Sequence, residues 1–425
     1  MNIRFYNGLI CSMAKKIEIT SDEEIWVKEN KIAYLGPAKS SDFKFDREID
    51  LKGNLLMPGF KNAHAHSAMT FLRSKADDLP LMDWLNYKIF PMEAKLKSEH
   101  VYYFSLLAIL EYLTSGITAV MDMYFFQDEM VKASIDVGFR SVIVSGTCGE
   151  DLNCVKKMEQ DYLKFNKIHE LISALIGFHA EYSNSNEMLK CISQVAQKHK
   201  APVFTHNSES KREVDDCIKK SGMTPTEYLN SLGLFDFGGG CFHCVHLSEN
   251  DFEIFKQKGI AAISCPGSNC KLASGIAPVS DMLNFGIKVA LGTDGPASNN
   301  ALDMFREMFT VTALQKIRNA DAASLDAIKV LEMATKFGAR VMGLEDCDSL
   351  APGKLADLIV IDLQQPNMQP LNNVLKNLVY SGSKQNVKLT MINGRILYEN
   401  GVFNVSVDPE KIYKTVNEMN SYYKN

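Results

Sequence analysis

Eight short apolar runs alternate with longer amphipathic segments between residues 55 and 292 of this 425-residue chain. Each run has the length of a buried strand, and the segments between the runs repeat apolar residues at helical spacing. Strands that alternate with helices form a parallel sheet, and eight such units close into a (β/α)8 barrel of the TIM type. The predicted strands are 55–66, 117–123, 140–145, 172–179, 202–206, 240–246, 260–264 and 287–292, and the clearest helices are 100–114, 129–137, 186–199, 224–232 and 251–258. The predicted fold class is therefore α/β.

Short strands and turns occupy both ends of the chain. Residues 1–56 contain several short segments with strand patterns. The same pattern of short strands and turns returns from Gly353 onward, after a long helix predicted at 325–342. Two β-rich ends around a barrel suggest one small β-sandwich made by both termini. We therefore predict the first part of the sandwich at 1–56, a catalytic barrel at 57–350, and the second part of the sandwich with a C-terminal helix at 351–425.

The composition excludes several functional classes. The net charge is -5 and no concentrated basic patch is visible, so nucleic acid is not expected as a partner. No apolar run approaches the roughly 18 residues of a membrane helix, so no membrane partner is expected. The ten cysteines are scattered and no secretory leader is recognisable, which favours reduced cysteines in the cytoplasm. The Cys241/Cys244 and Cys265/Cys270 pairs are interpreted as packing residues rather than as a structural zinc site.

Polar side chains fall where the predicted strands end. A (β/α)8 barrel carries its chemistry at this edge, because the loops that follow the strands meet there. His64 and His66 are two residues apart, so on a strand both imidazoles face the same side. The full set comprises His64, His66, His179, His206, His246 and Asp294. Three neutral imidazoles and a carboxylate are ligands that suit a divalent metal ion such as zinc.

On these residues the sequence is identified as resembling the amidohydrolase superfamily, and more narrowly the 5-methylthioadenosine/S-adenosylhomocysteine deaminases and related aminohydrolases. The likeness covers nearly the whole chain. Its motifs, in order, are PGFKNAHAH, FPMEAKL, GFHAEYS, FTHNSES, HCVHL and LGTDGPASNN. The resemblance implies an enzyme, a hydrolase acting on the C–N bond of a cyclic amidine. Such an enzyme would deaminate an adenosine-type nucleoside to the inosine derivative and ammonia.

The resemblance also implies a ligand set and catalytic residues. One divalent metal, zinc most simply and iron as the alternative, would be held by His64, His66, His206 and Asp294. A metal of this kind lowers the pKa of bound water toward about 7, which makes a nucleophile available. Glu209 would protonate the purine ring nitrogen, with Asp294 also acting in catalysis. Residues three apart on a strand face opposite sides, so only one histidine of HCVHL faces inward, and the family pattern is taken to select His246 over His243.

The same resemblance implies the substrate contacts. Glu93 would hold the ribose hydroxyls, because a carboxylate is a good acceptor for a vicinal diol. His179 would contact the purine, Ser298 would lie beside the substrate, and Trp84 would line the pocket. Of the nucleosides considered, 5′-methylthioadenosine and adenosine fit best, with S-adenosylhomocysteine left open.

The sequence departs from the family pattern in the loop expected to bind the amino-acid end of S-adenosylhomocysteine. Relatives that use this substrate are expected to present arginines from the loop after the third strand. Here that loop, residues 145–151, contains no arginine and two acids, and the nearest cations are Lys156 and Lys157. The sequence therefore predicts a preference for substrates without the carboxylate.

Two alternative functions remain. The first is an aminohydrolase of a free base or heterocycle such as guanine, a pterin or an s-triazine. The second is a non-catalytic scaffold that has lost its metal, although all the proposed ligands are present. A homo-oligomer is expected, as for many barrel enzymes.

Overall fold

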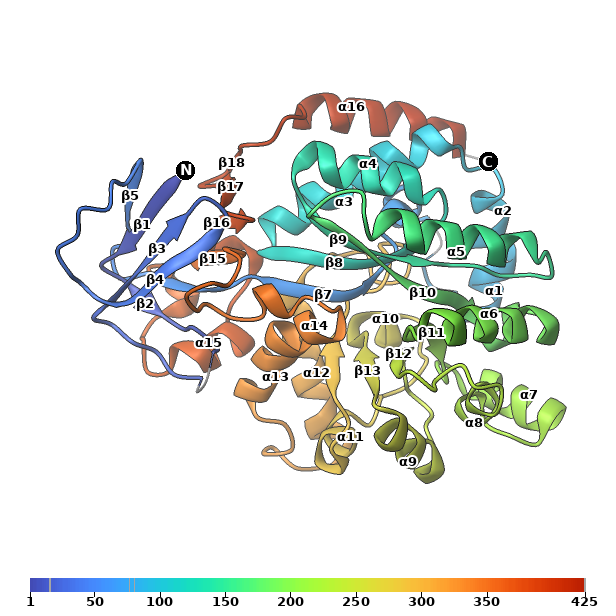
Figure 1. The fold of residues 1–425 in the computed structure, drawn as a ribbon. Helices are drawn as coiled ribbons and strands as arrows, with labels where there is room; N and C mark the ends of the chain where they lie inside the picture. Colours follow the sequence, from blue (N-terminus) through green and yellow to red (C-terminus); the bar gives the residue numbers. More distant parts are fainter. Residues whose placement is uncertain (15–16, 76, 80, 424–425) are drawn as a thin grey trace.

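The computed structural model describes residues 1–14, 17–75, 77–79 and 81–423, and a barrel of eight parallel strands lies at its centre (Figure 1). The strands follow one another in chain order around the sheet, from β7 to β14. They are β7 (Phe60–Ala65), β8 (Ile117–Tyr124), β9 (Arg140–Ser145), β10 (Ile172–Ala180), β11 (Val203–Asn207), β12 (Gly239–His243), β13 (Ile260–Ser264) and β14 (Val289–Leu291). This confirms the predicted fold class.

Helices cover the outside of the barrel, and this explains why its strands are apolar on both faces. One core lies inside the barrel and includes Met121, Phe204 and Phe242, while a larger core lies between strands and helices. The covering helices are α3 (Ser98–Thr114), α4 (Gln127–Val137), α5 (Asn153–Phe165), α6 (Asn186–His199), α7 (Lys211–Ser221), α8 (Pro225–Ser231), α9 (Glu249–Lys258), α11 (Val279–Phe285) and α12 (Met304–Arg318).

The barrel closes between its last and first strands. The N–H of Asp294, just past β14, donates to the carbonyl of His64 on β7 at 3.0 Å. A side-chain carbon added at Gly292 would lie only 2.8 Å from the Cβ of His64. Glycine is therefore required here, because the two backbones approach too closely for any larger residue.

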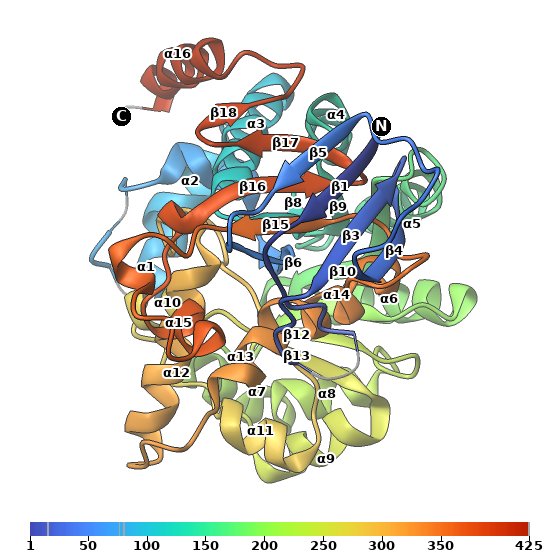
Figure 2. The same ribbon diagram turned by 90° about the vertical axis from the view of Figure 1, so that its left-hand side faces the viewer.

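Both chain ends form a β-sandwich at one end of the barrel, as predicted (Figure 2). One sheet has the order β4-β3-β1-β5, and the other has the order β18-β17-β16-β15-β6-β2. Their facing side chains, including Phe5, Leu56 and Leu358, make a separate core. The strands are β1 (Asn2–Tyr6), β2 (Leu9–Ile10), β3 (Glu23–Lys28), β4 (Lys31–Pro37), β5 (Arg47–Asp50), β6 (Leu55–Pro58), β15 (Leu358–Ile361), β16 (Val387–Ile392), β17 (Arg395–Glu399) and β18 (Val402–Phe403).

Two predicted elements are each divided in the structure. The predicted strand 55–66 is β6 of the sandwich followed by β7 of the barrel, because the chain changes sheets at Gly59. A side-chain carbon at Gly59 would lie 2.1 Å from Thr118, so only glycine allows this passage. The predicted helix 325–342 is α13 (Ala327–Ala334) and α14 (Lys336–Val341), broken where Thr335 leaves helical geometry with φ -128° and ψ -90°.

Short helices lie at the carboxyl ends of the strands: α1 (Leu81–Trp84) and α2 (Phe90–Glu93) follow β7, and α10 (Pro266–Lys271) follows β13. On the sandwich side, α15 (Val374–Tyr380) packs near α13. The last helix, α16 (Pro409–Asn420), packs on α3 on the outside of the barrel (Figure 1). No helix among the described residues is both long and apolar enough to cross a membrane.

Candidate active site

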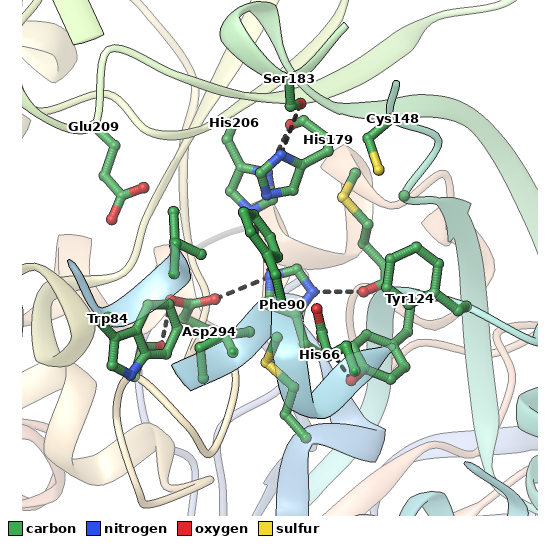
Figure 3. Close-up of a pocket in the computed structure, with 18 of the residues that line it drawn as sticks. His66, Trp84, Phe90, Tyr124, Cys148, His179, Ser183, His206, Glu209 and Asp294 are labelled. Atoms are coloured by element: carbon green, nitrogen blue, oxygen red, sulfur yellow. Dashed lines mark hydrogen bonds and ion pairs between the residues drawn. The ribbon is translucent and has the colours of Figure 1, made fainter. Parts of the chain in front are cut away.

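A cavity opens at the carboxyl ends of the barrel strands. Figure 3 shows residues from several strands and loops that line it. His66 follows β7, His179 belongs to β10, His206 to β11, and Asp294 follows β14. The loop that carries α1 and α2 adds Trp84 and Glu93.

Four side chains converge at the floor of this cavity. One potential ligand atom from each of His64, His66, His206 and Asp294 lies within 4.8 Å of the others. His66 Nε2 is 3.2 Å from Asp294 Oδ1, and His206 Nε2 is 3.3 Å from His66 Nε2. All four residues are buried. The sequence-predicted ligand set is thus gathered in one place.

Backbone carbonyls orient two of these imidazoles. His66 Nδ1 donates to the carbonyl of Met123 at 2.5 Å, and His206 Nδ1 donates to that of His179 at 2.7 Å. Each bond places the proton on Nδ1 and leaves the lone pair of Nε2 directed at the centre of the cluster. Metal-ligating histidines are commonly fixed in this way.

His64 gives a direct test of whether the cluster suits a metal. Its side chain is fully buried, and within the described part of the chain neither ring nitrogen has a hydrogen-bond partner. A buried polar atom without a partner is costly. Burial also lowers the pKa of His64 to about 3, so the ring is neutral and the lone pair of one nitrogen is free to bind a cation. The donor set therefore fits a divalent metal.

Two serines hold the carboxylate of Asp294. Ser268 Oγ and Ser298 Oγ each donate to Asp294 Oδ2 at 2.6 Å, which leaves Oδ1 facing the histidines. Burial alone would raise the pKa of Asp294, but contacts with His64 and His66 outweigh burial and hold this pKa well below its usual range. Asp294 is therefore an anion. Ser298 was predicted beside the substrate, and it also fixes this carboxylate.

Glu209 lies in the loop between β11 and α7, with its side chain in the cavity. Its carboxyl is buried, and burial raises its pKa, which favours the protonated form. Ser274 Oγ donates to Glu209 Oε1 at 3.4 Å. The loop is held by Glu213, whose carboxylate accepts the N–H groups of Ser208 and Glu209, each at 2.8 Å. Glu213 and Ser210 also form the capping box of α7.

The prediction that His246 rather than His243 faces the barrel interior is wrong. Strand β12 ends at His243, so the alternation of strand side chains does not extend to His246. Phe242 already faces the interior, and His243 and Cys244 take positive φ of 69° and 51°. This turn brings His243 back into the cavity. There its Nε2 lies 3.9 Å from Glu209 Oε2, and its Nδ1 donates to Asn269 Oδ1 at 2.8 Å.

His246 lies outside the cluster. Its Nε2 donates to the carbonyl of Ser274 at 2.7 Å, and the side chain lines a different cavity beside Lys271 and Arg212. Cys241 and Cys244 are both buried free thiols, and Cys244 Sγ donates to the carbonyl of Cys241 at 3.1 Å. Their contacts agree with packing residues.

The predicted substrate contacts all line the same cavity. Glu93 accepts a hydrogen bond from Tyr124 Oη at 2.7 Å, and burial raises the pKa of Glu93 to about 7. Trp84 is buried, and its indole N–H has no hydrogen-bond partner in the described chain. His179 Nδ1 bonds to Ser183 Oγ at 2.9 Å, and burial lowers the pKa of His179 to about 4.

Some residues of the site were missed by the sequence reasoning. Tyr124, which ends β8, and Cys148, in the loop after β9, line the cavity. Ser268 and Asn269 lie in α10 after β13 and hold Asp294 and His243 from behind the lining. All four lie at or after the ends of β8, β9 and β13, strands from which the sequence reasoning had selected no histidine or aspartate. Applying the strand-end rule to every strand would have found them.

Comparison with known proteins agrees with this geometry. A model of the amidohydrolase family matches residues 55–397. A 5-methylthioadenosine/S-adenosylhomocysteine deaminase from Thermoanaerobacter pseudethanolicus is 39% identical over 423 residues, covering 98% of each chain. One of the same name from Clostridium tetani is 38% identical over 99% of this chain and 98% of its own.

A solved structure shows the same fold. The zinc-bound adenosine deaminase from Xanthomonas campestris superposes with a TM-score of 0.94 at 30% identity, covering 99% of this chain and 98% of the other.

Proposed function

The chain belongs to the amidohydrolase family and is a hydrolase that acts on C–N bonds, and from this premise we propose that it is a metal-dependent deaminase of adenosine-type nucleosides. The substrates are 5′-methylthioadenosine and adenosine, and the products are the inosine derivative and ammonia. One observation carries the proposal: a single cavity is lined by Glu209 and Glu93 and has the four candidate metal ligands at its floor.

One divalent metal per chain, zinc most simply, would be held by His64, His66, His206 and Asp294. Such an ion would supply a nucleophile at neutral pH, because it would lower the pKa of bound water toward about 7. Burial lowers the pKa of His64 and His206 and so keeps both imidazoles neutral, while contacts with the histidines keep the Asp294 carboxylate charged. The zinc bound in the similar adenosine deaminase from Xanthomonas campestris supports this choice of metal.

Glu209 is the proton donor in this proposal. Burial raises the pKa of its carboxyl, which favours the protonated form that can transfer a proton to the purine ring nitrogen while water adds to the neighbouring carbon. A positioned acid of this kind contributes about 10²- to 10⁴-fold in rate. His243, in place of His246, stabilises the oxygen that is added. Its Nδ1 donates to Asn269 Oδ1, and although burial lowers its pKa, Glu209 and Asp294 outweigh burial and raise this pKa, which favours the charged ring that can also donate from Nε2.

The remaining lining residues orient the nucleoside. Glu93 and Tyr124 accept and donate hydrogen bonds to the ribose hydroxyls. The unpartnered indole N–H of Trp84 would be satisfied by an acceptor on the substrate. His179 contacts the purine, and Ser298 keeps Asp294 oriented. A homo-oligomer and a cytoplasmic location complete the proposal.

An ultraviolet deamination screen tests this function. Adenosine, 5′-methylthioadenosine, guanine and a pterin are offered to the purified enzyme, whose metal content is measured in parallel. We expect turnover of the two nucleosides, about one metal per chain, and loss of activity on chelation with recovery on adding zinc. Turnover of the free bases alone, a stoichiometry near two, or full activity after chelation would overturn it.

A further inference from the structure

A second cavity adjoins the active site. It has a volume of about 540 Å³ and shares five lining residues with the first cavity. The shared residues are Phe90, Glu93, Phe125, Gly146 and Cys148. In Figure 3, Cys148 lies on the side of Tyr124, away from Glu209 and Trp84. The second cavity is therefore an extension of the active site on the side of Glu93.

This position defines which part of the substrate reaches the second cavity. The inference rests on the proposed function, in which the purine lies over the metal cluster and the ribose hydroxyls lie at Glu93. The substituent on C5′ projects from the ribose away from the purine. It therefore enters the space that continues beyond Glu93.

The walls of the second cavity are mainly apolar. Phe125 and Phe126 directly follow β8 and are 37% and 42% exposed, and Met158 of α5 also lines the cavity. Further apolar residues of the wall are Phe90, Ala94, Leu96 and Cys154. Exposed aromatic side chains that line a concave surface favour an apolar ligand, because its binding removes their surface from water.

Lys157 is the only cationic side chain among the residues that line this cavity, all of which belong to the described chain. It is already paired: its Nζ donates to Asp161 Oδ2 at 2.8 Å, one turn along α5. The side chain of Lys157 is 58% exposed, whereas that of Asp161 is 13% exposed. An entering carboxylate would compete with Asp161 for Lys157 and would also face Glu93. Lys156 lines neither cavity.

We propose that the second cavity binds an uncharged, apolar substituent on C5′ of the nucleoside. In this arrangement Asp161 is a specificity-determining residue. It neutralises Lys157 and so disfavours nucleosides whose C5′ substituent ends in a carboxylate, such as S-adenosylhomocysteine.

The first test lengthens the apolar substituent. We expect kcat/KM to rise from 5′-methylthioadenosine to the ethylthio and propylthio analogues, by up to about fourfold for each methylene buried. The gain should lie in KM, because these groups bind the ground state and the transition state alike. A fall in kcat/KM from methylthio to propylthio would overturn the apolar assignment.

The second test changes the ion pair and measures the ratio of kcat/KM for S-adenosylhomocysteine to that for 5′-methylthioadenosine. In the wild type we expect a ratio of about one tenth or less. Asp161→Asn should raise it by up to about fivefold, the range of exposed ion pairs. Lys157→Met should lower it. The matched control is Asp215→Asn on α7, where Lys211 and Asp215 form a pair of the same spacing and the same 2.8 Å distance outside both cavities.

The outcomes separate this inference from the function on which it rests. If adenosine and 5′-methylthioadenosine are deaminated but Asp161→Asn leaves the ratio at the wild-type value, Asp161 does not set specificity. A wild-type ratio near one would also overturn the inference. If none of the nucleosides is deaminated, the proposed function fails together with it.

Discussion

His243 and His246 differ by three positions in the chain, and of the two it is His243 that lines the active-site cavity. We expect His243→Asn to lower kcat by about 10²- to 10⁴-fold, as for removal of a positioned acid–base group. His246→Asn should keep most of the wild-type kcat, because its contact with Ser274 lies outside the cluster. Steady-state kinetics on both variants, with metal content as the control, decide between them. Comparable losses in the two variants would assign a catalytic part to His246 after all.

Glu209 is tested by a substitution that keeps its shape. Glu209→Gln retains the metal and the fold but has no acidic proton to give, so we expect a loss of at least about 10²-fold in kcat. His206→Ala should instead lose the metal, because it removes a ligand from the cluster. Metal analysis and turnover measured on the same preparations separate the two effects. If Glu209→Gln keeps more than about a tenth of the wild-type rate, the proton donor is another residue.

At the scale of elements, the seam between β14 and β7 links barrel closure to the metal cluster. A methyl group at Gly292 would meet the Cβ, N and O of His64 at 2.8 to 2.9 Å. We expect Gly292→Ala to push β7 outward and to lower metal content, at a cost of about 1–3 kcal/mol in stability. Thermal unfolding and metal analysis measure both quantities.

Gly146 at the end of β9 provides the control for this substitution. The nearest atom to an added carbon there is Met123 Cγ at 3.5 Å, an ordinary contact. Gly146→Ala should therefore leave metal content and melting temperature near the wild-type values. Full metal loading in Gly292→Ala would show that the seam tolerates a wider spacing.

At the scale of the whole molecule, one buried ion pair joins the barrel to the sandwich. Arg140, the first residue of β9, donates to both oxygens of Asp357 at 2.6 and 3.0 Å, and Asp357 immediately precedes β15. The pair lies at the amino end of the strands, so Arg140 is not available to a substrate carboxylate at the opposite end. Removing one partner of such a pair leaves a buried charge without compensation.

We expect Asp357→Asn to lower the free energy of unfolding by about 3–5 kcal/mol. Burial raises the pKa of Asp357, but Arg140 outweighs burial and holds this pKa below its usual value. The stabilisation is therefore present above about pH 4, the unfolded value, and is lost as the pH falls through the lower folded-state pKa. The difference between wild type and variant should shrink over that range in urea unfolding measured at several pH values.

The partly exposed pair between Arg47 and Glu399 is the control, since Glu399→Gln should cost less than about 1 kcal/mol. An equal cost for Glu399→Gln and Asp357→Asn would mean that burial of the pair does not matter.

The sequence by itself determined the order of strands and helices, the barrel, the sandwich from both chain ends, and the residues gathered around His64 and Asp294. These follow from local periodicity and from the rule that parallel strands end at one edge, both of which are properties of regular backbone. Glu209 and Glu93 were assigned to the site through the family resemblance that their motifs carry.

Only the tertiary structure decided what happens where the backbone is irregular or where distant segments meet. Positive φ at His243 turns its side chain to the face opposite the one that strand alternation predicts. Gly59 allows the chain to cross from one sheet to the other, and the non-helical backbone of Thr335 divides a continuous apolar pattern into two helices. The buried environment of Glu93 depends on packing between elements far apart in the chain. The Lys157–Asp161 pair is local to α5, but only the assembled fold places it in the wall of the second cavity beside Glu93. Local sequence does not encode such contacts, because they form only when the barrel and its loops are assembled.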